Sequence, residues 1–267
     1  MVIRPLDIPV SSRISFLYVG NGVVEMDGHA VVLRQKDGHV HLPVGNATAL
    51  LIQPGTSITH AAISACAKSG CVMLWTGENG VRLYAAGDPG RDATALLRQA
   101  GYFSDNGKRL QVARGIFRFM FGEDPPVWRS VEQIRGMEGA RVKKIYQSLA
   151  ESRGVSWNGR RYNHGQSDKL NTAISCANAA LYGLTEAVIL ALGYAPSIGF
   201  VHTGDPRSFV YDVADCLKFK TVVPLAMDIA KEHDDDMEGR VRRGCRALFM
   251  ELGAAQMIVS IVDSLLA

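Results

Sequence analysis

The sequence changes its hydrophobic pattern once, at a Gly-Asp-Pro-Gly segment over residues 87–90, and this break constrains the fold most. Before the break, short runs rich in Val, Ile, Leu and Tyr are separated by Gly-Asn-Gly and Asp-Gly turn signals, a pattern typical of β-hairpins. After it, apolar residues recur with helical spacing over segments of helical length. Because Gly and Pro together interrupt both kinds of regular structure, the chain is expected to divide at this segment.

We therefore predict an α+β fold. A small, mainly antiparallel β domain occupies residues 1–86, a linker covers 87–90, and an all-helical domain follows over 91–267. Strands are expected in the runs 13–20, 22–33, 39–45, 71–77 and 80–87, with one helix over 60–70 that Thr59 caps. Helices of the second domain are expected over 93–103, 108–121, 130–152, 169–193, 208–220, 223–233 and 239–266.

Composition places the chain among soluble globular proteins and excludes collagens, disordered tails and mucin-like stalks. Of its 267 residues 47% are hydrophobic and 21% charged, enough for a sizeable core. The most apolar windows are interrupted by Glu, Pro or Asp, so no membrane span is expected, and the N-terminus has no signal-peptide pattern. Five scattered cysteines without a C-x-x-C pair predict neither disulfides nor structural zinc, so the expected location is the cytoplasm.

Charge is unevenly distributed along the chain. Residues 1–86 carry 6 Lys and Arg against 5 Asp and Glu, residues 87–165 carry 14 against 8, and residues 166–267 carry 9 against 13. A basic segment followed by an acidic one favours a polyanion such as nucleic acid, with a divalent cation between the acids and that polyanion. The alternative is two ordinary solvated surfaces.

Three places bring chemically active side chains among apolar neighbours. Glu138 lies between two glycines of an otherwise good helix, which favours close approach of a ligand, although a loose helix start is the alternative. His202 lies in a loop between helices, where a structural histidine bonded to backbone is the alternative. Asp212 and Asp215 share a helix face at i and i+3, where a solvated stripe is the alternative. Together these residues offer the mixed oxygen and nitrogen ligands of a divalent-metal site for phosphate chemistry.

A second segment suggests contact with DNA. SWNGRRY brings together Trp157, Arg160, Arg161 and Tyr162, which combine aromatic stacking with phosphate binding, although an ordinary surface turn is the alternative. The sequence has no P-loop, no dinucleotide-binding glycine motif and no nucleophile elbow.

These segments also resemble a known family, the CRISPR-associated spacer integrase, which is the larger subunit of the CRISPR adaptation complex. The resemblance is closest to its type I-E branch and covers nearly the whole chain. The segments that carry it are RSVEQIRGMEGARVKKIY, WNGRRY, LYGLTEAVILALGYAPSIGFVHTG, SFVYDVADCLKFKTVVPLAMDIA, HLPVGNATALLIQPGTSITHAA and GENGVRLYAAG.

The resemblance implies an N-terminal β domain and a helical catalytic domain. It implies that Glu138, His202 and Asp215 bind Mg²⁺ or Mn²⁺, and that Asp212 is a neighbouring functional carboxylate. An arginine that touches DNA in the family's β domain falls on Arg82.

The activity implied is a metal-dependent DNA endonuclease and integrase of antiviral defence. In two transesterifications, the 3′-hydroxyl ends of a short captured DNA would attack the borders of a CRISPR repeat. The implied partners are DNA, a second copy of the chain, and a small ferredoxin-like adaptation protein. Two other classes of function stay open from the residues alone, a non-catalytic DNA-binding scaffold and a metal-dependent phosphoesterase.

Overall fold

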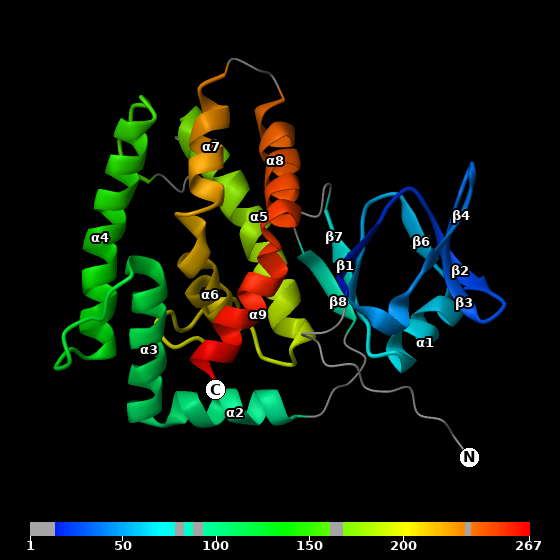
Figure 1. Ribbon diagram of the computed structural model, residues 1–267, viewed down its shortest axis with the longest axis horizontal. Helices are drawn as coiled ribbons and strands as arrows, with labels where there is room; N and C mark the ends of the chain where they lie inside the picture. The colour runs from blue at the N-terminus through cyan, green and yellow to red at the C-terminus, as the bar shows by residue number, and fades with distance from the viewer. Residues whose placement is uncertain (1–13, 78–82, 88–92, 161–167, 233–235) are drawn as a thin grey trace.

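The structure is a computed structural model that describes residues 14–77, 83–87, 93–160, 168–232 and 236–267. Strands and one helix come first along the chain and the remaining helices follow, which confirms the α+β class (Figure 1). The strands are β1 (Ile14–Val19), β2 (Gly22–Asp27), β3 (Ala30–Gln35), β4 (Gly38–Leu42), β5 (Ala47–Ile52), β6 (Thr56–Ile58), β7 (Val72–Thr76) and β8 (Leu83–Gly87). The helices are α1 (His60–Lys68), α2 (Thr94–Ser104), α3 (Asn106–Phe121), α4 (Val131–Ser152), α5 (Lys169–Ala191), α6 (Ser208–Lys218), α7 (Val222–Ala230), α8 (Met237–Leu252) and α9 (Ala254–Leu265).

The strands form two four-stranded sheets, ordered β1-β5-β7-β8 and β4-β3-β2-β6. Consecutive strands pair antiparallel in β2/β3 and β3/β4, as the two Asp-Gly turn signals predict, and β7/β8 also pair antiparallel. The hairpin expected at Gly-Asn-Gly does not form, because β1 and β2 belong to different sheets. The expectation of a mainly antiparallel domain is corrected by β1/β5, β5/β7 and β2/β6, which pair in parallel. Each parallel pair joins strands separated by at least one other element, and such long connections allow the chain to return in the same direction.

Two strands were not predicted from the sequence, β5 and β6. Strand β5 is buried at every position, so its apolar run shows no alternation between core and solvent. The predicted helix cap is confirmed, because the Thr59 hydroxyl oxygen accepts the Ala62 backbone N–H at 3.3 Å. Helix α1 then ends before Gly70, whose φ of 67° is the left-handed conformation that glycine tolerates.

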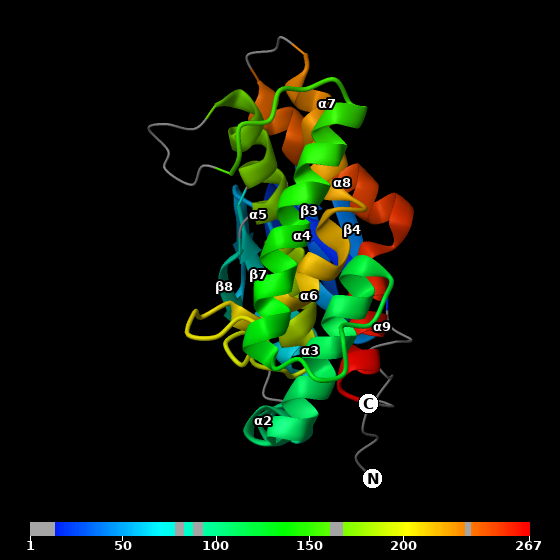
Figure 2. The same ribbon diagram turned by 90° about the vertical axis from the view of Figure 1, so that its left-hand side faces the viewer.

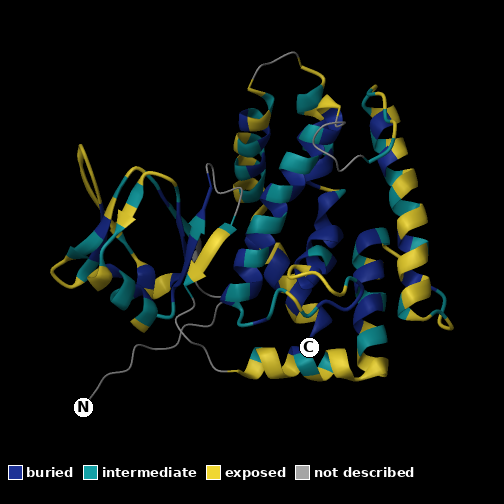
Figure 3. Ribbon diagram, turned by 180° about the vertical axis from the view of Figure 1, so that it is seen from behind, coloured by how far each residue is buried: buried dark blue, intermediate teal, exposed yellow. Residues whose placement is uncertain are grey.

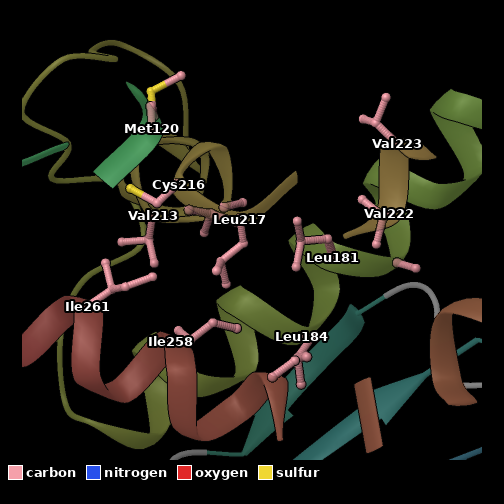
Figure 4. Packing of buried hydrophobic residues seen from close by; sticks show 14 of the residues in the cluster. Met120, Leu181, Leu184, Val213, Cys216, Leu217, Val222, Val223, Ile258 and Ile261 are labelled. Atoms are coloured by element: carbon pink, nitrogen blue, oxygen red, sulfur yellow. The ribbon is translucent and has the colours of Figure 1, made fainter. Parts of the chain in front are cut away.

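The helical part packs around α5, which is buried along most of its length (Figure 3). Leu181 and Leu184 of α5 meet side chains from α6, α7 and α9 in one apolar cluster (Figure 4). By length and composition α5 is apolar enough to cross a membrane, but 61% of that apolar window is buried inside the fold. The helix therefore serves as the core of the bundle.

The single helix predicted over 239–266 is wrong, because the structure divides it into α8 and α9. The break lies at Gly253, whose φ is 58°, and the two helices are bent by 64°. Apolar spacing continues through the break, so hydrophobic periodicity alone could not locate it.

The sheet that contains β5 and β7 packs directly on the helical part. Leu51 and Leu74 share a buried apolar cluster with Ala187 and Ala191 of α5, where small side chains let helix and sheet approach closely. Strand β8 ends at Gly87 and α2 begins at Thr94. The division of the chain into two domains at 87–90 remains a prediction.

Candidate metal centre

Glu138 is supplied by helix α4, which lies at the outer edge of the helical part (Figures 1 and 2). The helix begins with a capping box, in which the Ser130 hydroxyl and the Gln133 side chain each accept the other residue's backbone N–H. Glu138 is therefore deep in the helix and not in its first turn, which excludes the loose-start alternative. Its side chain faces inward and is only 9% exposed.

The loop between α5 and α6 carries His202 and is anchored from α2 by a buried glutamine. The Gln99 Nε2 group donates to the carbonyl oxygens of Ala195 at 3.0 Å and Ile198 at 2.8 Å. Its Oε1 atom accepts the Ala195 backbone N–H at 2.8 Å. Because Gln99 is fully buried, these three bonds fix the path of the loop before it reaches the histidine.

The same loop turns tightly at Gly199. A Cβ atom there would lie 2.3 Å from the His202 carbonyl oxygen and 2.7 Å from the backbone of Ser208, so only glycine fits. From α3, Arg109 Nε donates to the Phe200 carbonyl oxygen at 3.1 Å. The turn therefore places the backbone of His202 close to the start of α6.

The Asp212 carboxylate holds the loop through hydrogen bonds. This fully buried group accepts the backbone N–H groups of Phe200 at 2.5 Å, Val201 at 3.1 Å and His202 at 2.9 Å. The same carboxylate accepts Nδ1–H of the His202 ring at 2.8 Å. This bond leaves Nε2 with a free lone pair, the usual arrangement of a metal-binding histidine with a carboxylate behind it. The alternative of a histidine bonded only to backbone is therefore not what the structure contains.

Asp215 follows one helical turn later on the same face of α6. It is 5% exposed and forms an ion pair with the Lys218 ammonium group at 2.7 Å. Lys218 is itself buried, and its Nζ atom lies 4.9 Å from the centroid of the Phe219 ring. The pair stabilises a negative charge on Asp215 inside the fold.

The structure brings three predicted ligands together. Ligand atoms of Glu138, His202 and Asp215 all lie within 4.8 Å of one another, and they come from α4, the α5–α6 loop and α6. Two carboxylates and an imidazole at this spacing suit a hard or borderline divalent cation. Asp212 supports these three residues through its hydrogen bond to the His202 imidazole. Since Asp212 and Asp215 are both buried, they are not a solvated stripe of the helix.

The titratable groups of this cluster shift one another's pKa values. Burial and the negative charge of Asp215 raise the pKa of Glu138 to about 7. Burial acts to lower the pKa of His202, but its hydrogen bond with Asp212 and the nearby carboxylates outweigh burial and raise it. Burial likewise opposes the charged form of Lys218, and the charge of Asp215 raises its pKa. A divalent cation beside these carboxylates would favour the ionised form of Glu138 against both burial and the repulsion by Asp215.

His202 and Asp215 line a cleft of about 1210 Å³, and Gly139, the residue after Glu138, lines it as well. Helices α4, α5 and α6 line most of it, and Pro54, Gly77 and Tyr84 of the β part line one side. Its basic side chains are Lys143, Arg160, Arg207, Lys218 and Arg242, and its aromatic ones are Tyr84, Tyr146, Trp157, Tyr182 and Tyr211. A cleft with both kinds of side chain suits a nucleic-acid strand.

The predicted DNA-binding residues are only partly described. The Trp157 ring stacks on Tyr146 with centroids 4.9 Å apart, and Arg160 donates to Asn171 and Ser175 of α5 at 3.2–3.3 Å. Both Trp157 and Arg160 line the cleft. Arg82, Arg161 and Tyr162 lie outside the described residues.

Sequence reasoning missed three residues near the ligands. Lys218 follows Asp215 at i+3, a spacing that could have identified it as a partner on the same face. The Tyr211 ring lies edge-on to the His202 ring at 5.9 Å, and the Arg207 guanidinium lies 5.5 Å from the Tyr211 ring centroid. Arg207 and Tyr211 are i and i+4 at the start of α6, a spacing that could also have indicated their contact.

Comparison with known proteins identifies the family. The model of the family described as CRISPR associated protein Cas1 matches residues 17–121 and 123–246. The chain belongs to the Cas1 family. The CRISPR-associated endonuclease Cas1 of Geobacter sulfurreducens is 47% identical over 265 residues, which cover 97% of this chain and 87% of that protein. The CRISPR-associated endonuclease Cas1 of Escherichia coli K12 is 44% identical over 265 residues, again 97% and 87%.

A solved structure has the same fold over nearly the full length. The crystal structure of a TtCas1–DNA complex superimposes with a TM-score of 0.85 at 36% sequence identity, covering 96% of this chain and 97% of that chain. These likenesses confirm the resemblance found in the sequence and the expectation of a CRISPR-associated endonuclease.

Proposed function

We propose that this Cas1 family member joins short captured DNA fragments to a CRISPR repeat by metal-dependent transesterification. The observation that carries the proposal is the convergence of Glu138, His202 and Asp215 within 4.8 Å, in a cleft lined by basic and aromatic side chains. In the reaction, the 3′-hydroxyl oxygen of the captured strand attacks a repeat phosphodiester. One P–O bond forms, one breaks, and the displaced strand leaves with a 3′-hydroxyl.

The residues present fit Mg²⁺ or Mn²⁺. Two carboxylates favour Mg²⁺, and the imidazole favours Mn²⁺, so both ions are proposed. When bound, such an ion neutralises the charge that develops on the phosphate and lowers the pKa of the attacking hydroxyl. Asp212 keeps the Nε2 lone pair of His202 available, and Lys218 holds the Asp215 carboxylate in place through their ion pair.

The cleft supplies the positioning that phosphoryl transfer requires. We propose that Trp157, Arg160, Arg161 and Tyr162 bind the strand that carries the reacting end, with Arg82 contributing from the β part. Arg160 is held in place by its bonds to α5, so its guanidinium is preorganised at the wall of the cleft. The crystal structure of a TtCas1–DNA complex supports DNA as the ligand of this fold.

The assembly and location follow from the family resemblance. We propose that the chain acts in the cytoplasm as a homodimer, together with a small ferredoxin-like adaptation protein. A non-catalytic DNA scaffold would not need three ligand groups converging on one point. A phosphoesterase for small substrates would not need so wide a cleft.

The test is His202→Ala in a strand-joining assay. Joining of a fluorescent DNA with free 3′-hydroxyl ends to a repeat-bearing plasmid is expected to fall by about 100-fold or more, the scale of losing one main electrostatic contribution. Gel-shift affinity for the same DNA is expected to stay unchanged, because phosphate contacts are spread over many Lys and Arg side chains.

The matched control is His39→Ala, which removes an exposed histidine from β4 and should leave joining intact. Wild-type joining that persists in EDTA would contradict metal dependence. Normal joining by the His202 variant would show that its imidazole is structural.

A further inference from the structure

We infer that Gly139 keeps open the place where the DNA strand comes closest to helix α4. The inference rests on the proposed function, because it names a contact of the same cleft. Gly139 lies inside a 22-residue helix, where glycine is less favourable than alanine.

Packing does not explain this glycine. A Cβ atom built at Gly139 would meet no other atom within 4 Å, so no neighbouring side chain or backbone requires the position to be small. Its φ is not in the left-handed region either, so the backbone conformation would accept any residue. The empty space beside Gly139 is therefore available to something other than the protein.

That space belongs to the cleft. Gly139 lines the cleft directly after the ligand Glu138, and Val142, Lys143 and Tyr146 line it from the same helix. The positions i, i+3, i+4 and i+7 form one continuous stripe along α4. The stripe begins with bare backbone, continues with an exposed ammonium group at Lys143, and ends at the Tyr146 ring.

The chemistry of this stripe matches an extended nucleic-acid strand. To react, a phosphodiester must come close to the Glu138 carboxylate. Glycine at the next position lets the bulky sugar-phosphate backbone approach the helix closely. One turn further, Lys143 can neutralise the next phosphate. Trp157, which is partly exposed and stacks on the buried Tyr146 ring, can present aromatic surface to a base. A methyl group at 139 would project into this path.

Gly136 provides a matched control in the same helix. It is also exposed, and a Cβ atom there would also meet nothing within 4 Å. Gly136 does not line the cleft. Alanine should therefore improve the helix equally at both positions, whereas only the change at 139 enters the path of the DNA.

The experiment compares Gly139→Ala, Gly139→Leu and Gly136→Ala in the full chain. All three should raise Tm, the two alanines by roughly 2–4 °C. Strand joining and gel-shift affinity for the fluorescent DNA should fall about 10-fold with Gly139→Ala, further with Gly139→Leu, and not at all with Gly136→Ala. The Mn²⁺ concentration that gives half of the full thermal shift should stay the same in all variants.

Normal DNA affinity and joining in both 139 variants would overturn the inference. An equal loss in Gly136→Ala would also overturn it, because flexibility of the helix and not open space would then be the cause. Weaker Mn²⁺ binding by Gly139→Ala would overturn it as well, by placing the effect on Glu138. A wild-type chain that binds Mn²⁺ and DNA but joins nothing would instead refute the proposed function.

Discussion

The three acids at the candidate metal centre, Glu138, Asp212 and Asp215, are buried in different surroundings. Asp212 accepts four hydrogen bonds, and Asp215 pairs with Lys218. In contrast, burial and the negative charge of Asp215 raise the pKa of Glu138 to about 7. A buried carboxylate in this position favours function at the expense of stability in the absence of a cation.

This imbalance makes Glu138→Gln a stabilising change in the metal-free protein. The folded chain holds the Glu138 proton more tightly than the unfolded chain, so the stability it contributes is full below about pH 4.5 and lost as pH rises to about 7. The glutamine variant avoids this loss, and its Tm in EDTA should exceed that of the wild type at pH 8 but not at pH 5.

Glu151→Gln, an exposed change in the same helix, should leave Tm unchanged at both pH values. Mn²⁺ should raise the Tm of the wild type and of this control, but not that of Glu138→Gln. A lower Tm for Glu138→Gln in EDTA at pH 8 would contradict the proposed repulsion.

Asp212→Asn tests how the histidine is oriented. The amide keeps the size of the carboxylate, but in either orientation its NH₂ group faces two N–H donors. It opposes either the His202 ring and backbone or the Phe200 and Val201 N–H groups, so the loop that positions the ring is disturbed. Affinity for Mn²⁺, measured by titration calorimetry, should fall about 10–100-fold. An unchanged affinity would mean that the loop alone positions the imidazole, through Gln99 and Arg109.

The candidate ligands could be located from the sequence, but the residues that hold them in place could not. Glu138, His202 and the Asp212–Asp215 pair stand out because polar groups among apolar residues need a reason. The anchors Gln99 and Arg109 contact the loop from 91 to 99 residues away in the sequence. Such contacts exist only after α2 and α3 have packed against α5 and α6, so no local pattern encodes them.

Among the secondary-structure elements, the bounds of most helices could be predicted from the sequence, whereas the pairing of several strands could not. Helices α2 to α7 lie within a few residues of their expected ranges, because a 3.6-residue repeat is a local signal. Parallel pairing depends on where a distant strand arrives, as with β1 and β5. The bend between α8 and α9 escaped prediction because Gly253 interrupts the backbone and not the apolar pattern.

Gly253→Ala should destabilise the protein. With φ at 58°, an L-residue there places its Cβ close to the following carbonyl oxygen, at a cost of about 1–2 kcal/mol. Tm should fall by a few degrees, measured by circular dichroism. Gly136→Ala serves as the opposite control, since a helical φ and open space should make that alanine stabilising. A rise in Tm for Gly253→Ala would show that α8 and α9 can straighten into one helix.

In the molecule as a whole, the candidate metal centre and the sheet that contains β5 and β7 are linked through α5. The helix lines the cleft with Asn178 and Tyr182, and about one turn later it packs on β5 and β7 with Ala187 and Ala191. The apolar contact means that the sheet cannot separate from α5 without exposing buried surface. Binding at the metal centre should therefore stabilise the sheet as well.

Ala187→Glu tests this coupling, because it buries a charge between α5 and the sheet. Trp75 in β7 and Trp157 beside the cleft report on the two parts, once the exposed Trp128 is replaced by Phe. In the wild type, Mn²⁺ at 100 times its Kd contributes about 2.7 kcal/mol, and the unfolding temperatures reported by both tryptophans should rise together.

In Ala187→Glu, the two fluorescence transitions should separate, and Mn²⁺ should shift only the one reported by Trp157. Ala140→Glu, an exposed change on α4, should preserve the joint transition. If Mn²⁺ left the Trp75 transition of the wild type unmoved, the small apolar contact would be too weak to couple the parts. Mn²⁺ binding would then stabilise the helical part alone, and the contact between α5 and the sheet would not transmit that stabilisation to the sheet.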